Sequence, residues 1–479
     1  MTGADQQKSK GIYLHVAIIL LLMFGVKFIP PFGTITSLGM QIIGIFAGII
    51  YGWSTMGMIW PSFLGIFALG LLPGNSMAET FKAAFGDRVT IVIMMFLLFA
   101  NLIEKVGLST YIANWCISRR CVQNKPYAIL AMFCLAGGLV SALVNVFAGM
   151  ILIWGVFYSF CEQAGLKKED TFPRVALIAI IYVSCMSGDI LPFMGLSLLI
   201  VGQQSTFLGL GINYAGFAVM QLILVLLASM LYFTAVRFIF RPDVSKLKDT
   251  RSLLPDELVM TGQQKLVLGL LAAMMLMLFL TGILPQSWTV TQFLKAIDIA
   301  GPLALVLTAY YIVNLRSTEV ISFSEISKGL NWDLILMFAT VAPLSAAVAN
   351  GDAGILSFIS SQLSRIFNDM DPYVFTILII LIASVITQFA NNVAVCLMVM
   401  PLMYTFALQL GADPLVLSVL CAFNLNVAFC TPAASGPAAM VFGNRQWIPL
   451  KDAYCHGIII FVINMLVTII GLPLAELFF

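Results

Sequence analysis

Apolar runs constrain this chain more than any other feature of its sequence, because they recur from end to end and are each about 20 residues long. A helix of that length crosses the hydrocarbon core of a bilayer. The runs are continuously apolar rather than alternating, which excludes a transmembrane barrel. Charged residues make up 10% of the chain, whereas soluble domains carry roughly 25%. The sequence therefore predicts an all-α polytopic membrane protein.

Eleven runs predict single helices, and two longer elements have a different pattern. Residues 126–161 and 372–409 each hold two apolar stretches between one pair of loops. The predicted single helices lie near residues 12–30, 37–52, 56–72, 89–105, 174–189, 213–237, 265–283, 300–315, 332–349, 414–430 and 453–474.

The two halves of the chain repeat one another at a nearly constant offset of 245 to 247 positions. The matched pairs are Pro126 with Pro372, Gly107 with Gly354, Asn145 with Asn392, and Pro192 with Pro437. Four matches in the same order argue for a duplication. We therefore expect an N-terminal half, 1–240, and a C-terminal half, 265–479, joined by a linker at 241–264.

Basic residues sort the loops by side, because cytoplasmic loops carry an excess of Lys and Arg. The linker and both loops around 126–161 are rich in them. In contrast, the loop before 372–409 carries one Arg and the loop after it carries no basic residue. Matching elements on opposite sides mean an inverted repeat, a common plan of transporters. We expect the inner (cytoplasmic) membrane, with the N-terminus inside and the C-terminus outside. The residues concerned are Arg119, Arg120, Lys125, Lys167, Lys168, Arg174, Arg241, Lys246, Lys248 and Arg251.

Each half then contains a re-entrant helical hairpin, since an element that enters and leaves on one face is not a simple span. The tips fall near Asn145 and Asn392. Opposite each hairpin lies a helix that Gly and Pro interrupt, at 174–200 and 414–445, and such breaks free backbone groups. Irregular backbone at membrane depth survives only inside protein or beside a wet cavity. We predict that two tips and two broken helices form one binding site.

Asparagine suits such a site because its amide offers an oxygen to a cation and N–H groups to an anion. A single membrane asparagine often serves instead as a hydrogen-bonding group between helices. The matching positions of Asn145 and Asn392 favour ligands over that alternative, whereas Asn391 has only Val144 as its counterpart.

Asp189 is the one acidic residue placed well inside a broken helix, where an ionisable side chain is costly and marks a functional site. It binds a cation, exchanges a proton in place of a sodium ion, or caps the restarted helix. The predicted midplane segments contain no Lys or Arg. An anion there depends on helix N-termini, amides, a co-bound cation, and the hydroxyls of Ser141, Ser187 and Ser435.

At these residues the chain resembles the divalent anion:sodium symporter family, within the wider ion transporter superfamily of dicarboxylate, citrate and sulfate carriers. The best-matching segment is GPAAMVFGNRQWIPLKDAYCHG, residues 436–457. The family has a Ser-Asn-Thr triplet at each hairpin tip. This chain keeps both asparagines and replaces the flanking residues with Val144 and Val146 in one tip, and with Asn391 and Val393 in the other. The resemblance implies an elevator-type transporter that works as a homodimer.

The same resemblance implies the ligands, with sodium as the only metal and Asp189 standing where the family has a glycine carbonyl. For the substrate it implies Asn145, Val146, Asn391, Asn392, Val393, Ser435, Gly436 and Pro437. For sodium it implies Ser141, Val144, Asn145, Gly188, Asp189, Thr387, Ala390, Asn392 and Ala434.

We therefore expect a secondary active transporter that moves a small organic anion, of the di- or tricarboxylate class, together with Na⁺. The alternative is a proton-coupled or exchange carrier for a monocarboxylate or another anion, which Asp189 and the lost triplet hydroxyls favour. A cation/proton antiporter or an arsenite-type carrier is a weaker option. The nine cysteines form no CxxC pair, which argues against a disulfide framework or a zinc site, and two histidines argue against a His-based metal or catalytic site. No enzyme activity is expected, because the sequence places no intramembrane set of His, Cys, Ser and Asp on facing helices. No cofactor or nucleic-acid partner is expected.

Overall fold

The computed structural model describes residues 3–119, 125–209, 213–247, 259–285, 287–315, 320–367, 370–432 and 434–479. Within these ranges every regular element is helical, which confirms the prediction of an all-α protein. Arg120 and a large part of the predicted linker, residues 248–258, lie outside the described residues.

The N-terminal half contains eleven helices within the described ranges. They are α1 Gly3–Gly25, α2 Ser37–Thr55, α3 Ile59–Gly70, α4 Met77–Phe85, α5 Arg88–Lys105, α6 Leu108–Ile117, α7 Pro126–Leu143, α8 Val146–Gln163, α9 Thr171–Ser187, α10 Gly195–Leu208 and α11 Tyr214–Ala235. A π-helical turn, Val236–Phe240, extends α11.

The C-terminal half contributes as many helices to the described part of the chain. They are α12 Gly262–Ile283, α13 Thr289–Ala296, α14 Ala300–Val313, α15 Phe323–Ser327, α16 Trp332–Ala349, α17 Ile355–Phe367, α18 Pro372–Ile386, α19 Asn392–Leu410, α20 Pro414–Leu425, α21 Gly436–Gly443 and α22 Leu450–Phe478.

Length and composition make this a multi-pass membrane protein. Among the described helices, eight are long and apolar enough to cross a bilayer. The number rises to ten if each of two bent pairs, α4–α5 and α13–α14, forms one span. Three of the shorter apolar helices, α9, α18 and α20, belong to the elements that were predicted to be broken or re-entrant.

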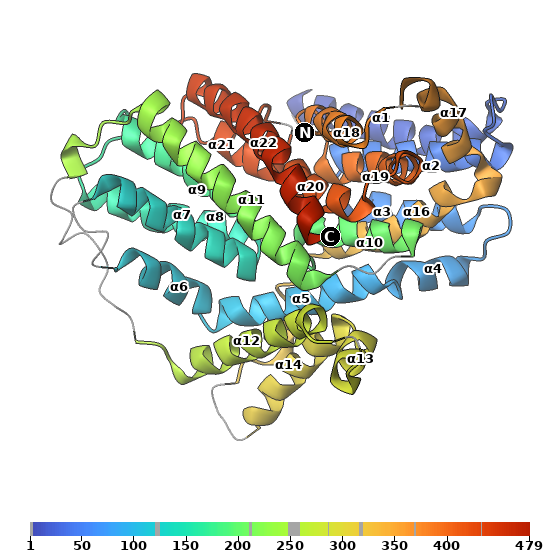
Figure 1. Ribbon diagram of the computed structural model, residues 1–479. Coiled ribbons are helices and arrows are strands. Elements are labelled where there is room, and N and C mark those ends of the chain that lie inside the picture. Colours follow the sequence, from blue (N-terminus) through green and yellow to red (C-terminus); the bar gives the residue numbers. More distant parts are fainter. Residues whose placement is uncertain are drawn as a thin grey trace.

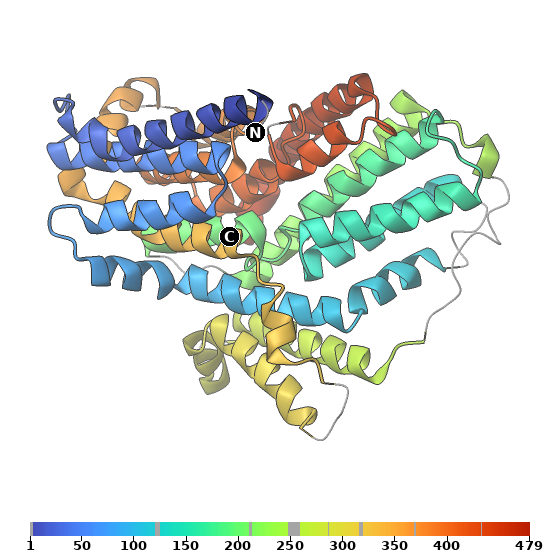
Figure 2. The same ribbon diagram turned by 180° about the vertical axis from the view of Figure 1, so that it is seen from behind.

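Two groups of helices lie on either side of a shared centre, and α12, α13 and α14 belong to neither group (Figures 1 and 2). One group holds α7, α8, α9 and α11, and the other holds α1 to α4 with α16 and α17. Between them, α10 contacts α5, α16, α19 and α20. Helix α9 is buried along nearly its whole length, so the end of α9 and the start of α10 lie deep in the protein.

Local backbone geometry repeats at two of the four pairs that the sequence had matched. Gly107 and Gly354 both adopt the left-handed conformation, with φ of 73° and 68°, directly before α6 and α17. This conformation favours glycine because it has no Cβ. Pro126 and Pro372 each open the first helix of a predicted hairpin, a position that suits the missing N–H of proline.

Several boundaries differ from those predicted. The helices α4, α6, α13, α15 and α17 were not predicted, because they are shorter than a membrane span and mix polar with apolar residues. The helix predicted over 414–430 is five residues too long, since α20 ends at Leu425. The helix predicted over 174–189 ends at Ser187. In both cases the chain unwinds earlier than its apolar pattern indicates.

Candidate functional site

The first hairpin tip is a two-residue connection between α7 and α8. Asn145 is the N-cap of α8, and its side-chain oxygen accepts a hydrogen bond from the N–H of Ala148 at 2.7 Å. Capping of this kind satisfies one of the four N–H groups that a helix start leaves unpaired. The amide nitrogen of Asn145 has no hydrogen-bond partner among the described residues. One end of the amide is therefore used for structure and the other is available.

The second tip divides the same two roles between adjacent asparagines. Asn391 caps α19 by accepting from the N–H groups of Val393 at 2.9 Å and Ala394 at 3.4 Å. Asn392 instead accepts a hydrogen bond from the hydroxyl of Thr387 at 2.7 Å. The structural counterpart of Asn145 as a cap is thus Asn391, although the sequence had paired Asn145 with Asn392. Thr387 and Asn392, both proposed as sodium ligands, are in direct contact.

Asp189 organises the first break, between α9 and α10. Its Oδ1 accepts from the N–H of Leu196 at 3.0 Å and from that of Ser197 at 3.3 Å. The Ser197 hydroxyl in turn donates to the Asp189 carbonyl at 2.9 Å. The residue is 2% exposed, and Oδ2 is buried with no hydrogen-bond partner among the described residues. Asp189 therefore caps α10, and it also presents one free carboxylate oxygen.

The second break, between α20 and α21, is stabilised by a side chain from the second hairpin. The Oε1 of Gln388 accepts from the N–H groups of Phe429 at 3.1 Å and Cys430 at 3.0 Å. The hydroxyl of Thr431 donates to the main-chain oxygen of Gln388 at 2.5 Å. At the end of this break, Ser435 caps α21 by accepting from the Ala438 N–H at 3.1 Å.

Three close contacts join the tips and the breaks, and two of them run between the two halves. The side chain of Asn426, in the second break, donates to the carbonyl of Cys185 near the end of α9 at 2.9 Å. A Cβ added to Gly188 would lie 2.1 Å from Cγ2 of Val146 in the first tip. A Cβ added to Gly436 would lie 2.7 Å from Cζ of Phe147. The start of α8 therefore packs against the breaks of both halves.

This arrangement suits a cation and an anion together. In the described part of the chain, the buried Ser141 hydroxyl and Asp189 Oδ2 have no hydrogen-bond partner, and free oxygens are the ligands that a hard cation requires. The first turns of α8 and α21 add N–H groups that have no carbonyl inside their own helix. Such groups bind anions. Neither tip and neither break contains a Lys or Arg, so a bound anion has no fixed positive partner.

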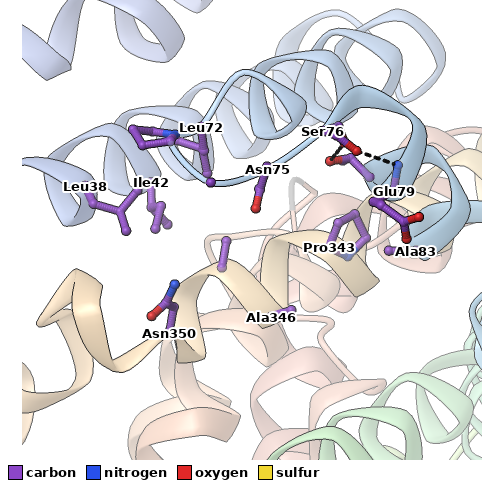
Figure 3. A pocket seen from close by; sticks show the side chains of 14 residues that line it. Leu38, Ile42, Leu72, Asn75, Ser76, Glu79, Ala83, Pro343, Ala346 and Asn350 are labelled. Carbon is purple, nitrogen blue, oxygen red and sulfur yellow. Dashed lines mark hydrogen bonds between the residues drawn. The ribbon is translucent and has the colours of Figure 1, made fainter.

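A separate cavity of about 470 Å³ lies between α2, the α3–α4 connection and α16 (Figure 3). Its lining includes Asn75, Glu79, Pro343 and Asn350, with one carboxylate and no basic side chain. None of its lining residues belongs to a hairpin or to a broken helix. The cavity is therefore distinct from the candidate site.

Comparison with known proteins decides the family. Residues 42–422 match the citrate transporter family, and this range includes both hairpins and the first break. The chain therefore belongs to the citrate transporter family. As a member of this family it is a membrane transporter.

Two curated relatives of this family member are sodium-dependent dicarboxylate transporters named SdcS. The protein from Staphylococcus saprophyticus is 23% identical over 410 residues, which cover 82% of this chain and 77% of the relative. The protein from Staphylococcus aureus strain USA300 is 22% identical over 411 residues, with the same coverage. These relatives confirm the family resemblance seen in the sequence.

A solved structure supports the fold. The YdaH transporter of Alcanivorax borkumensis matches with a TM-score of 0.53 at 14% identity, over 85% of this chain and 89% of that one. At this level of identity the likeness concerns the fold alone.

The remaining predicted ligands of this citrate transporter family member differ in what they can offer. Val144 and Ala434 are each 1% exposed, and Ala390, Val146 and Val393 are half-buried. Their side chains are apolar, so only main-chain groups of these residues could contact an ion. Gly436 and Pro437 form the first turn of α21.

Sequence reasoning missed Gln388 and Asn426, which carry the contacts within and between the halves. The available signal for both was a polar amide in an apolar segment, the same signal that singled out Asn145.

Proposed function

We propose that this protein is a secondary active transporter that carries a small carboxylate anion, of the di- or tricarboxylate class, together with Na⁺. The observation that carries the proposal is the meeting of capped tips and helix breaks at a site with free buried oxygens and no basic side chain. The names of the SdcS relatives support both Na⁺ and a dicarboxylate.

The electrostatics of the site give a physical reason for coupling. Helix N-termini attract an anion, but each contributes only about half an elementary charge. Because the tips and breaks have no Lys or Arg, the full positive charge that stabilises a carboxylate has to come from a cation that binds together with the substrate. Na⁺ held by Thr387 and Asn392 on one side, and by Ser141 and Asp189 on the other, would supply it. Substrate then binds well only when the cation is present.

The proposal extends to an inverted repeat and to a homodimer in the inner membrane. It also includes an elevator movement, in which the hairpins and the broken helices move together. The matched glycines and prolines support the duplication, and the basic loops support opposite orientations with the N-terminus inside and the C-terminus outside. The elevator and the dimer rest on the family resemblance.

Uptake into proteoliposomes tests the coupling ion directly. A panel of labelled mono-, di- and tricarboxylates is offered with a Na⁺ gradient, a proton gradient, or neither. We expect a Na⁺ gradient alone to drive uptake of a di- or tricarboxylate. Thr387→Val should raise the half-saturating Na⁺ concentration about tenfold, a loss of about 1.4 kcal/mol of binding. The matched control is Thr376→Val, also buried and on α18, which should leave it unchanged. Uptake that ignores Na⁺ would contradict the proposal.

A second candidate, a proton-coupled or exchange carrier for a monocarboxylate or another anion, is favoured by one observation. Asp189 Oδ2 is buried and no described residue forms a hydrogen bond with it, so it can hold a proton as well as a cation. Uptake driven by a proton gradient in the absence of Na⁺ would select this candidate. Asp189→Asn separates the roles: it keeps an oxygen to cap α10 but cannot ionise. If the variant keeps both the pH and the Na⁺ dependence of uptake, Asp189 serves only as a cap.

A further inference from the structure

A groove of about 390 Å³ lies between the first turns of α7 and the end of α11, away from the candidate transport site. Tyr127 and Ala131 line it from α7. Phe233 and Phe238 line it from α11 and its π-helical extension, together with Arg237. The groove is thus largely apolar with a single cationic side chain.

Arg237 carries a positive charge that no carboxylate of the described residues neutralises. Its guanidinium lies 5.5 Å from the centre of the Tyr127 ring. A cation–π contact of this kind holds the group over the ring and leaves its five N–H donors open to a further acceptor. The residue is exposed. The groove therefore holds the Arg237 guanidinium in a fixed place, where its N–H groups can donate hydrogen bonds to an anion.

A second groove begins on the other side of Phe238. It has about 400 Å³, runs between α11 and α22, and is lined by apolar side chains such as Ile239, Val462 and Leu466. Phe238 and Thr234 line both grooves, and Phe238 is 60% exposed. The two grooves thus lie on either side of Phe238, and Arg237 is the residue directly before Phe238 in the chain.

We propose that the groove between α7 and α11 binds an anionic phospholipid. Its phosphate would form hydrogen bonds with the Arg237 guanidinium, and its two acyl chains would lie in the two grooves beside Phe238. Charge complementarity favours this occupant, because Lys125 precedes α7 and Arg241 follows the π-helical turn, at the ends of α7 and α11 that line the groove. Phosphate and guanidinium form strong charge-assisted hydrogen bonds. The proposal is independent of the substrate that the transporter carries.

The simpler explanation is that Arg237 only marks the cytoplasmic end of α11, as the positive-inside rule requires. Its positive charge there would also interact favourably with the negative end of the helix dipole. That explanation predicts no preference between lipids. It also predicts that filling the groove has no effect on lipid binding.

Native mass spectrometry of the full-length protein in detergent distinguishes the two explanations, with phosphatidylglycerol and phosphatidylcholine as probes. We expect phosphatidylglycerol to bind more tightly. Arg237→Gln should reduce that binding about fivefold, because one basic residue contributes about 1 kcal/mol to anionic lipid binding, and should leave phosphatidylcholine unchanged. Arg237→Lys should keep most of the preference. The matched control is Arg445→Gln at an exposed turn after α21. Equal behaviour of the Arg237→Gln and Arg445→Gln variants overturns the proposal.

Two further arms separate lipid from other occupants. Ala131→Phe narrows the groove without changing charge and should weaken the binding of phosphatidylglycerol. Glycerol 3-phosphate, which has the phosphate but no chains, should not compete at equal concentration. Competition would assign the site to a soluble phosphate and overturn the lipid. Light scattering should give the same mass for the wild type and for Ala131→Phe. A lower mass for the variant would assign the groove to a second copy of the chain.

Discussion

Gly188 lies where the first tip presses on the first break, and adding one methyl group there tests the candidate site. Gly188 has a right-handed backbone, with φ of −64°, so alanine is conformationally acceptable and the obstacle is space. The new Cβ would lie 2.1 Å from Val146 Cγ2, whereas carbon atoms pack best at about 3.5–4.0 Å. The tip must therefore move by about 1.5 Å. Val146 cannot simply rotate away, because β-branched side chains in helices are restricted to one rotamer.

Overpacking of this size costs about 1–3 kcal/mol, which corresponds to roughly a 5- to 150-fold shift in an equilibrium. We expect Gly188→Ala to raise the half-saturating concentrations of Na⁺ and substrate in proteoliposome uptake by at least about fivefold. The matched control is Gly155→Ala in α8, where an added Cβ meets no atom within 4 Å.

A second substitution shows whether the contact itself is responsible. Val146→Ala in the Gly188→Ala background removes the clashing methyl group and should recover about 1 kcal/mol or more of coupling energy. The reasoning is refuted if Gly188→Ala transports like Gly155→Ala, or if the double variant is no better than Gly188→Ala alone.

Three further outcomes are expected. Gln388→Leu leaves the buried N–H of Phe429 and the part-buried N–H of Cys430 without an acceptor, at about 1–3 kcal/mol for the buried one, and should lower the thermal unfolding midpoint in detergent. Gln204→Leu is the control, because that buried amide has no hydrogen-bond partner among the described residues, and an equal drop in both variants would contradict the argument. Asn426→Ala removes the bond to the end of α9 and should cost about 0.5–1.5 kcal/mol of stability and reduce uptake; full activity would show that this link is dispensable. The hydrogen bond from Lys246 holds the pKa of Asp170 below its usual value, so this exposed pair stabilises the fold above about pH 4 and stops doing so as the pH falls through the lowered pKa. The unfolding midpoint of Asp170→Asn should therefore fall slightly less than that of the wild type as the pH drops below about 4. The same fall in both proteins would contradict a role of this pair in stability.

The apolar spans were predictable because the bilayer imposes a length on them. The helix predicted over 332–349 is observed at Trp332–Ala349, and Asn331, the polar residue just before the apolar run, caps its start. Short helices such as α6 and α17 escaped prediction because tertiary packing and a preceding left-handed glycine define them. Hydropathy does not register either of these causes.

The candidate site was predictable in its location but not in its hydrogen bonds. The polar residues in apolar segments pointed to the tips and the breaks. Which asparagine caps α19 depends on the backbone angles of the tip, so the sequence could not distinguish Asn391 from Asn392. Gln388 was missed for another reason: the N–H groups that it accepts from lie 41 and 42 residues further along the chain. Only the folded arrangement brings them together.

The solitary carboxylate at the first break has an electrical consequence. If the hairpins and the broken helices move together through the bilayer, Asp189 moves with them, and an ionised Asp189 gives the empty moving unit one negative charge. A transmembrane voltage of 100 mV acts on one such charge with about 2.3 kcal/mol. The return of the empty carrier would then be the voltage-sensitive half of the cycle, and substrate-free capacitive currents would vanish in Asp189→Asn.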